Sequence, residues 1–129
     1  MPEAVTEELL RLNRRLLDSI VRGDWPAYQE LCDPSLTCFE PEAAGQLVEG
    51  MDFHEFYFKL GAVQGNHNTT MCSPSVRLMG EAAVVAYVRL NQRVSAAGQP
   101  TTTAVLETRV WHRQAGKWKH VHFHRSPAG

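Results

Sequence analysis

Three arginines, Arg89, Arg109 and Arg125, occupy segments with the alternating pattern of β-strands. Successive side chains of a strand point to opposite faces, so residues of like parity reveal which face each arginine shares. The neighbours of like parity are largely apolar or aromatic: Val85 and Tyr87, Val105 and Trp111, Val121 and Phe123. The pattern therefore predicts three guanidinium groups on the inner face of a curved sheet.

Buried guanidinium groups need partners, because an unpaired charge in the interior costs several kcal/mol. Glu107 has the parity of Arg109 and is a candidate counter-ion. Any single arginine could be structural, paired with an internal acid or reaching a rim. Three together favour a site for small carboxylates or an acidic peptide segment, because guanidinium groups pair bidentately with carboxylates.

The elements that must position these arginines can be predicted from hydrophobic periodicity and turn residues. Leu9, Leu12, Leu16 and Ile20 recur at helical spacing and predict a helix that lies against a sheet. Helices are expected over 5–22, 25–31 and 51–60, and extended segments over 35–39, 46–48, 68–78, 82–93, 101–113 and 117–125. Helices followed by a long antiparallel sheet make one α+β domain, residues 1–129.

The last hairpin carries a parity conflict. A two-residue loop of Ala115 and Gly116 would place Arg109 opposite His122, on the wrong face. One extra residue corrects the pairing, so we expect a bulge beside Gly116 that aligns Arg109 with Phe123.

Polar and aromatic residues near the helix starts have simpler interpretations. Asp24 is expected to cap the helix over 25–31, and Asp52 the helix over 51–60. Phe53, Phe56 and Tyr57 form one face of that later helix and are expected to serve the core and a subunit interface.

The histidines of the last strand raise the question of a metal. His120, His122 and His124 alternate on one predicted face, with His112 on the neighbouring strand. Alternate residues on a flat strand are too far apart for all three to reach one ion, so we predict a polar stripe at a subunit contact, with no metal and no cofactor.

Composition excludes several classes of protein. The chain has 129 residues, 43% of them hydrophobic, and a net charge of -1, without a basic stripe for nucleic acid. It has no apolar run of about 18 residues for a membrane span and no signal segment. Three cysteines, Cys32, Cys38 and Cys72, lack a motif-like spacing and indicate free thiols in a reducing, cytoplasmic compartment.

Longer collinear motifs, spread over about residues 5 to 126, resemble the association (hub) domain of calcium/calmodulin-dependent protein kinase II. They include Cys32-Asp33-Pro34, Phe39-Glu40-Pro41-Glu42-Ala43, Leu47-Val48-Glu49-Gly50, Asp52-Phe53-His54, Phe56-Tyr57-Phe58, Ala86-Tyr87-Val88-Arg89, Glu107-Thr108-Arg109-Val110-Trp111-His112-Arg113 and Val121-His122-Phe123-His124-Arg125-Ser126. No kinase motif accompanies them, so we expect neither a kinase domain nor calmodulin binding in this chain.

The resemblance implies a cone-shaped, cystatin-like (nuclear-transport-factor-2-like, SnoaL-like) fold, with the N-terminal helix packed in a strongly curved sheet. It also implies a homo-oligomer of ring-stacked dimers, of the dodecamer or tetradecamer class or larger. The family's cavity arginines match Arg89, Arg109 and Arg125, and His54 matches a histidine bordering that cavity. Residues 60–63 stand where the kinase hubs carry a mobile tryptophan, so gating by that aromatic is not carried over.

Two other functions use the same cavity. One is a stand-alone small-molecule-binding protein; the other is an isomerase- or cyclase-type enzyme with His54, Tyr57 or Tyr87 as acid or base. Arginines lower the basicity of a carboxylate base, which argues against the enzyme. We therefore predict an assembly hub without catalytic residues, whose ligand-binding set is Arg89, Arg109, Arg125, His54, Glu107, Tyr57 and Tyr87.

Overall fold

The computed structural model describes residues 2–128. Within that range it has three α-helices, a short 3-10 helix and six strands. Their bounds are α1 Pro2–Arg22, α2 Trp25–Leu31, β1 Cys32–Phe39, η1 Pro41–Ala43, β2 Val48–Glu49, α3 Asp52–Phe58, β3 His67–Met79, β4 Ala82–Val94, β5 Pro100–Gln114 and β6 Lys117–Pro127. The predicted α+β class is confirmed, and each predicted element lies within a few residues of its observed position.

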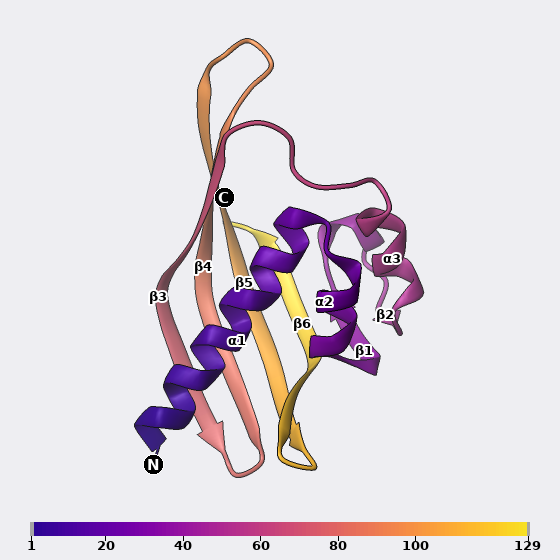
Figure 1. Ribbon diagram of the computed structural model, residues 1–129, viewed down its shortest axis with the longest axis vertical. Coiled ribbons are helices and arrows are strands. Elements are labelled where there is room, and N and C mark those ends of the chain that lie inside the picture. The colour runs from indigo at the N-terminus through magenta and orange to yellow at the C-terminus, as the bar shows by residue number, and fades with distance from the viewer. Residues whose placement is uncertain (1, 129) are drawn as a thin grey trace.

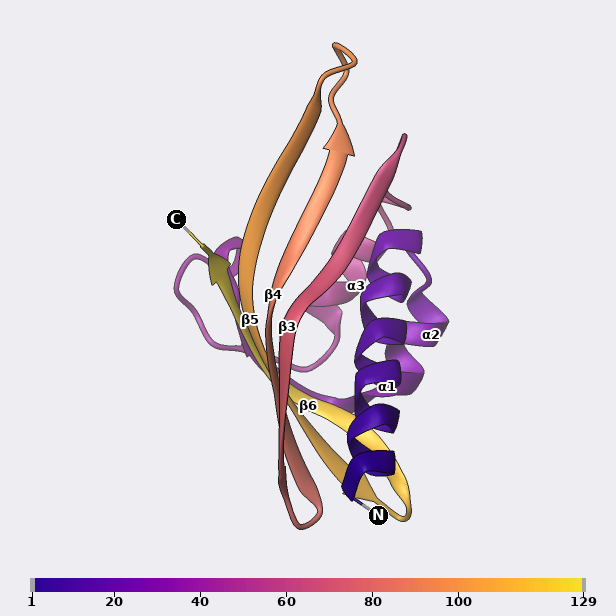
Figure 2. The ribbon, with the colours of Figure 1, turned by 90° about the vertical axis from the view of Figure 1, so that its left-hand side faces the viewer.

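The strands form one open, twisted sheet in the order β2-β1-β6-β5-β4-β3. All neighbouring pairs are antiparallel except β1 and β6, which run parallel. Figures 1 and 2 show α1 lying along one face of this sheet, with α2 and α3 beside its β1–β2 end. The strand β4 is interior, as its two apolar faces predict.

Helix α1 buries Leu9, Leu16 and Leu17 against the sheet, as its spacing predicts. Asn13 is also buried on this face, where its side-chain oxygen accepts a hydrogen bond from Trp111 Nε1 at 3.1 Å. This bond ties α1 to β5, because a buried indole N–H left without a partner would be costly.

The turn after α1 brings two distant backbone segments together. Gly23 has a φ of +66°, and a Cβ there would lie 2.9 Å from the carbonyl carbon of Gly61. Only glycine fits both the left-handed backbone and this close approach. Val63 N–H also donates to the Val21 carbonyl at 2.9 Å, so the segment after α3 is held against the end of α1. Among residues 2–128, no helix combines the length and apolar character needed to cross a membrane.

The last hairpin corrects the expected position of the bulge. Gln114 pairs with Lys117 across the two-residue turn, and Arg109 pairs with Phe123, as predicted. The register shifts farther along β6, where Trp111 pairs with His120 and Val110 with His122. The extra residue is therefore Val121, and the prediction of a bulge beside Gly116 is wrong. The turn itself needs no extra residue because Ala115 and Gly116 both adopt positive φ, which suits a tight hairpin.

This displacement also breaks the predicted histidine stripe. His120 is fully buried on the inner face, whereas His122 is half-buried and His124 is exposed on the other face. Strand parity reverses across a bulge, so residues on its two sides no longer alternate in one series. The prediction that His120, His122 and His124 share a face is therefore wrong.

Helix α3 differs from its prediction at its first residues. Asp52 is its first helical residue rather than its cap, and the N-cap position, Met51, makes no side-chain capping bond. Phe56 and Tyr57 are exposed, while Phe53 is half-buried against the core. By contrast Asp24 caps α2 as predicted, since its Oδ1 accepts from Ala27 N–H at 3.1 Å.

Candidate functional site

A cavity of about 220 Å³ opens between the sheet, α1, α2 and α3, and it contains the predicted arginines. Its volume is below the roughly 300 to 1,000 Å³ of ordinary ligand pockets. The wall is formed by Ile20, Tyr28, Glu40, Glu42, His54, Tyr57, Phe58, Arg89, Arg93, Arg109, Phe123 and Arg125. We divide it into a deep part around Glu107 and a rim around Arg125.

The deep part is built on the buried carboxylate of Glu107. Arg109 Nη2 donates to Glu107 Oε1 at 3.0 Å, and Arg89 Nε lies 3.0 Å from Oε2. Tyr87 donates its hydroxyl to Oε1 at 2.6 Å and accepts from Arg109 Nε at 2.9 Å. The Arg109 guanidinium also lies 4.5 Å above the ring of Phe123. Glu107 is therefore the counter-ion that strand parity predicts.

The charges of the deep part stabilise one another. Burial alone would raise the pKa of Glu107, but Arg109 and Arg89 outweigh burial and lower it. Burial likewise opposes the charge of Arg109, and the neighbouring Tyr87 and Glu107 raise its pKa instead. Burial lowers the pKa of Arg89 despite Glu107. The pKa of Tyr87 is raised, chiefly by burial, so this hydroxyl acts as a hydrogen-bond donor and not as a base.

The rim is organised by Arg125, whose Nη1 pairs with two carboxylates. It lies 3.2 Å from Glu40 Oε1 and 2.7 Å from Glu42 Oε1. Both acids come from the chain around the start of η1, just beyond β1. Burial raises the pKa of Glu40, and Arg125 opposes that effect. Glu40 and Glu42 therefore already pair with Arg125, the cation that a bound anion would use.

Two guanidinium nitrogens retain unused hydrogen-bonding capacity. Among residues 2–128, the buried Nε atoms of Arg89 and Arg125 have no aligned hydrogen-bond acceptor. Both atoms face Glu107 Oε2, which within the same range also lacks an aligned partner: Arg89 Nε is 3.0 Å from it and Arg125 Nε 3.6 Å, close enough for ion pairs without the alignment of a hydrogen bond. Buried donors of this kind are uncommon and call for an explanation, such as a ligand or an ordered water.

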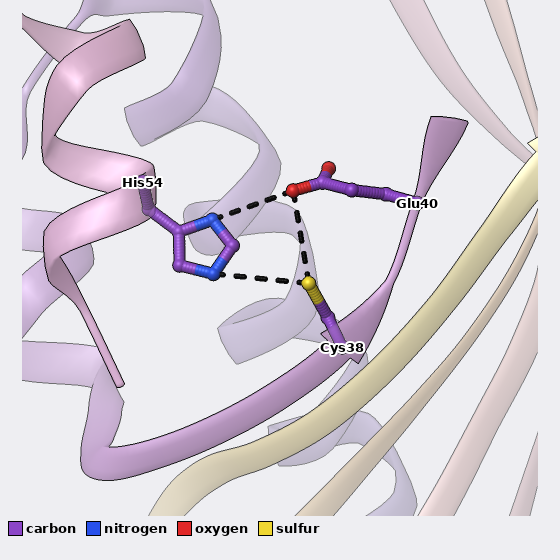
Figure 3. Close-up of side chains that lie close together, drawn as sticks. All are labelled: Cys38, Glu40 and His54. Carbon is purple, nitrogen blue, oxygen red and sulfur yellow. Dashed lines mark hydrogen bonds and ion pairs between the residues drawn. The ribbon is translucent and has the colours of Figure 1, made fainter. Parts of the chain in front are cut away.

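A second polar cluster adjoins the rim, formed by Cys38, Glu40 and His54 (Figure 3). Cys38 Sγ lies 3.8 Å from His54 Nε2 and 3.7 Å from Glu40 Oε2, and His54 Nδ1 lies 3.5 Å from the same Oε2. Burial lowers the pKa of His54 to about 4, with a smaller contribution from Arg109. Burial and Glu40 raise the pKa of Cys38 to about 12. Near neutral pH the imidazole is therefore neutral and the thiol protonated.

Most of the predicted ligand-binding residues come together in this cavity. Arg89, Arg109, Arg125, His54 and Tyr57 lie on its wall. Glu107 and Tyr87 lie behind the wall and hold Arg109 in place.

Sequence reasoning missed the acids of the rim, Glu40 and Glu42, as well as Cys38 and Arg93. Arg93 follows Arg89 at even spacing along β4 and could have been found by parity. Glu40 and Glu42 lie beyond the end of β1, where no periodicity indicates a direction. The site thus contains four arginines and three carboxylates, which leaves one positive charge uncompensated. The arginines are Arg89, Arg93, Arg109 and Arg125, and the carboxylates are Glu40, Glu42 and Glu107.

The cysteines agree with the prediction of free thiols. Cys32 and Cys38 are buried, and Cys72 is half-buried. Burial chiefly raises the pKa of Cys32 to about 12, and its sulfur lies 3.4 Å from His120 Nδ1. The buried thiols of Cys32 and Cys38 are therefore protonated and unreactive near neutral pH.

Comparisons with known proteins identify the family of the chain. Residues 5–129 match the family model described as calcium/calmodulin dependent protein kinase II association domain. The chain is 50% identical over 127 residues to the delta subunit of calcium/calmodulin-dependent protein kinase type II from Oryctolagus cuniculus, covering 96% of this chain and 24% of that relative. The chain thus spans about a quarter of the length of this curated relative.

Solved structures give the same result for the fold. The association domain of the C. elegans kinase has a TM-score of 0.92 and 45% identity, and 96% of each chain is covered. A nuclear-transport-factor-2-like protein from Salmonella enterica has a TM-score of 0.80 at 23% identity, covering 100% of this chain and 94% of that one, which shows the fold alone. The predicted nuclear-transport-factor-2-like fold is therefore confirmed, and the chain belongs to the calcium/calmodulin-dependent protein kinase II association-domain family.

Proposed function

We propose that this protein is a hub whose function is to assemble into a closed homo-oligomer of ring-stacked dimers. Membership of the association-domain family over residues 5–129 is the observation that carries this proposal. That family serves association rather than catalysis, so no catalytic role is assigned to the cavity. Closed symmetry follows because identical surface patches must all be covered. A cytoplasmic location remains part of the proposal, supported by the three free cysteines.

An exposed apolar surface on and after α3 supports the assembly. Phe56 is 62% exposed, Leu60 72% and Tyr57 39%. Large apolar side chains that cluster on a surface are typical of protein interfaces. We infer that this surface, defined by Phe56, Tyr57 and Leu60, contributes to contacts between subunits.

Native mass spectrometry and light scattering test the assembly. A particle of the dodecamer or tetradecamer class is expected, whereas a monomer whose mass does not change with concentration would refute the proposal. Phe56→Glu is expected to lower the particle mass, because a buried unpaired carboxylate is costly in an apolar contact. Phe56→Leu is the matched control and should leave the mass unchanged. Equal masses for both variants would remove the α3 surface from the interface.

We further propose that the cavity binds a small carboxylate through Arg125 and Arg89. The one positive charge left uncompensated among the arginines and acids of the cavity supports an anionic ligand. The small volume favours a compact carboxylate over a peptide segment. Ion pairs between arginine and carboxylate in such a recess are stronger than at the surface, because water screens them less.

Calorimetric titration with acetate and butyrate tests this binding, with ethylamine as a cationic control. Arg125→Gln is expected to weaken carboxylate binding by about 10- to 100-fold, the equivalent of a lost charge-assisted hydrogen bond. Arg113→Gln is the matched control, because Arg113 pairs with Glu81 at the surface, outside the cavity. Equal affinities in wild type and Arg125→Gln would refute the proposal. Arg109 is a poor test position, since its loss would leave Glu107 buried without its main partner.

A further inference from the structure

The cluster of Cys38, Glu40 and His54 brings together three side chains of the types that bind transition metals. Cys38 and Glu40 lie two residues apart at the end of β1, so both point to the same side, and α3 supplies His54 from across the gap. Figure 3 shows the thiol and the carboxylate facing the edge of the imidazole ring that carries its two nitrogens. A thiolate, an imidazole and a carboxylate are each established ligands of Zn²⁺.

The spacing of the donor atoms matches one side of a tetrahedral site. One ligand atom from each residue lies within 4.8 Å of the other two. Zinc bond lengths imply separations of about 3.6 Å between sulfur and either partner and about 3.4 Å between nitrogen and oxygen. The observed separations are 3.8 and 3.7 Å from sulfur and 3.5 Å between nitrogen and oxygen. The two imidazole contacts use different nitrogens, so the ring must turn to direct a single nitrogen at a shared ion.

We propose that Cys38, Glu40 and His54 form a binding site for Zn²⁺ or a closely related divalent transition metal, next to the arginine cavity. The site has three protein ligands and one open position. The alternative is a set of ordinary hydrogen bonds, but the 3.5 Å contact between His54 and Glu40 is longer than such bonds usually are.

Surrounding residues already hold the ligands in position. Arg125 binds Glu40 Oε1, which leaves Oε2 directed at the cluster. The rings of Phe53 and Phe123 each lie 5.6 Å from the His54 ring and enclose it from two sides. Outer contacts of this kind orient metal ligands and commonly change metal affinity by about 10- to 100-fold.

A divalent ion is neutralised by its own ligands, although arginines are near, because a thiolate and a carboxylate together carry two negative charges. Arg125 keeps Glu42 as a partner, and Arg109 keeps Glu107. A neutral imidazole offers a lone pair to the metal, whereas the thiol must release its proton when the metal binds.

The open position of the site faces the cavity, because Glu40 and His54 both lie on the cavity wall. Three protein ligands with one open position are the usual arrangement of a zinc that binds water or another small ligand. The probe for this site is the metal alone, so its test does not depend on the proposed carboxylate binding.

The test uses the tag-free protein, stripped of metal with a chelator and titrated with Co²⁺ and then with Zn²⁺. One Co²⁺ per chain is expected, with the near-ultraviolet charge-transfer absorption that a thiolate ligand produces and the visible bands of tetrahedral cobalt. Zinc should displace the cobalt and abolish both signals. Metal content after dialysis gives the stoichiometry independently.

Cys38→Ser should lose the charge-transfer band and bind metal at least about tenfold more weakly, while His54→Gln should weaken binding and retain sulfur ligation. Two matched controls, Cys72→Ser and Cys32→Ser, should keep both the band and the stoichiometry; Cys32 is the sharper control because it also lies beside a histidine. Circular dichroism and particle mass verify folding, and His54→Gln decides the question if Cys38→Ser does not fold. The proposal is overturned if the wild type binds no metal, or if both Cys38→Ser and His54→Gln bind as the wild type does.

Discussion

The deep part and the rim of the cavity are built from the same two residue types, yet their arginines have different roles. In the deep part Arg109 is 1% exposed and is held by Glu107, Tyr87 and the face of Phe123. At the rim the side chain of Arg125 is 18% exposed and is shared between Glu40 and Glu42. An arginine in the interior is therefore part of the fold, whereas an arginine near water is available to exchange one carboxylate for another.

The physical reason is the difference in solvation. Removing one partner of a buried ion pair leaves a charge that neither water nor protein compensates, at a cost of about 3 to 5 kcal/mol. An exposed pair gains only about 0 to 1 kcal/mol, because water solvates each partner nearly as well as the other does. On the proposed function, a ligand competes at the rim, while the deep part holds the recess in shape.

The largest expected effect tests the deep part. Glu107→Gln should lower the free energy of unfolding by about 3 to 5 kcal/mol, since Arg89 and Arg109 lose their shared carboxylate. Urea denaturation at constant protein concentration measures this change. The matched control, Glu81→Gln, breaks only the surface pair with Arg113 and should cost less than about 1 kcal/mol. Similar losses for the two variants would erase the distinction between the deep part and the surface.

A smaller effect concerns protonation beneath Arg109. His120 is fully buried, 3.4 Å from Arg109 Nη1, and burial with that guanidinium holds its pKa well below the ordinary value. The unfolded chain takes up a proton below about pH 6.5 and the native chain does not, so stability is present above that pH and is lost as the pH falls.

The free energy of unfolding should therefore decrease by up to about 1.4 kcal/mol per pH unit from this residue between pH 6.5 and 5. His120→Gln should reduce that slope without abolishing it, because His54 contributes in the same direction. Urea denaturation across the pH range measures both slopes. If the pH dependence of the free energy of unfolding is unchanged in His120→Gln, then His120 is protonated in the folded protein as easily as in the unfolded chain, and the deep part tolerates that added charge.

The smallest effect sharpens the picture of the rim. Glu42→Gln removes one of the two carboxylates that occupy Arg125, so added acetate should bind a few-fold more tightly, an effect below about 1 kcal/mol. Calorimetric titration measures the affinity, with Glu81→Gln as a control outside the cavity. Weaker binding in Glu42→Gln would mean that Glu42 helps to hold the ligand site instead of competing with the ligand.

Strand parity by itself determined much of this protein. The alternation around Arg89 and Arg109 placed both on the inner face and made Glu107 a candidate partner of Arg109, because the period of a strand is local and regular. Helical spacing similarly predicted α1 and its buried stripe, and Asp24 was recognisable as a cap from its place before α2.

Only the tertiary structure decided the features that interrupt a period or join separate segments. The bulge at Val121 turned His120 inward. The position of this bulge cannot be read from the sequence alone. Glu40 comes from beyond β1 and His54 from α3, so their meeting with Cys38 and Arg125 depends on how those elements pack. Local sequence sets the direction of a side chain within one element, whereas distances between elements follow from the packing of the whole chain.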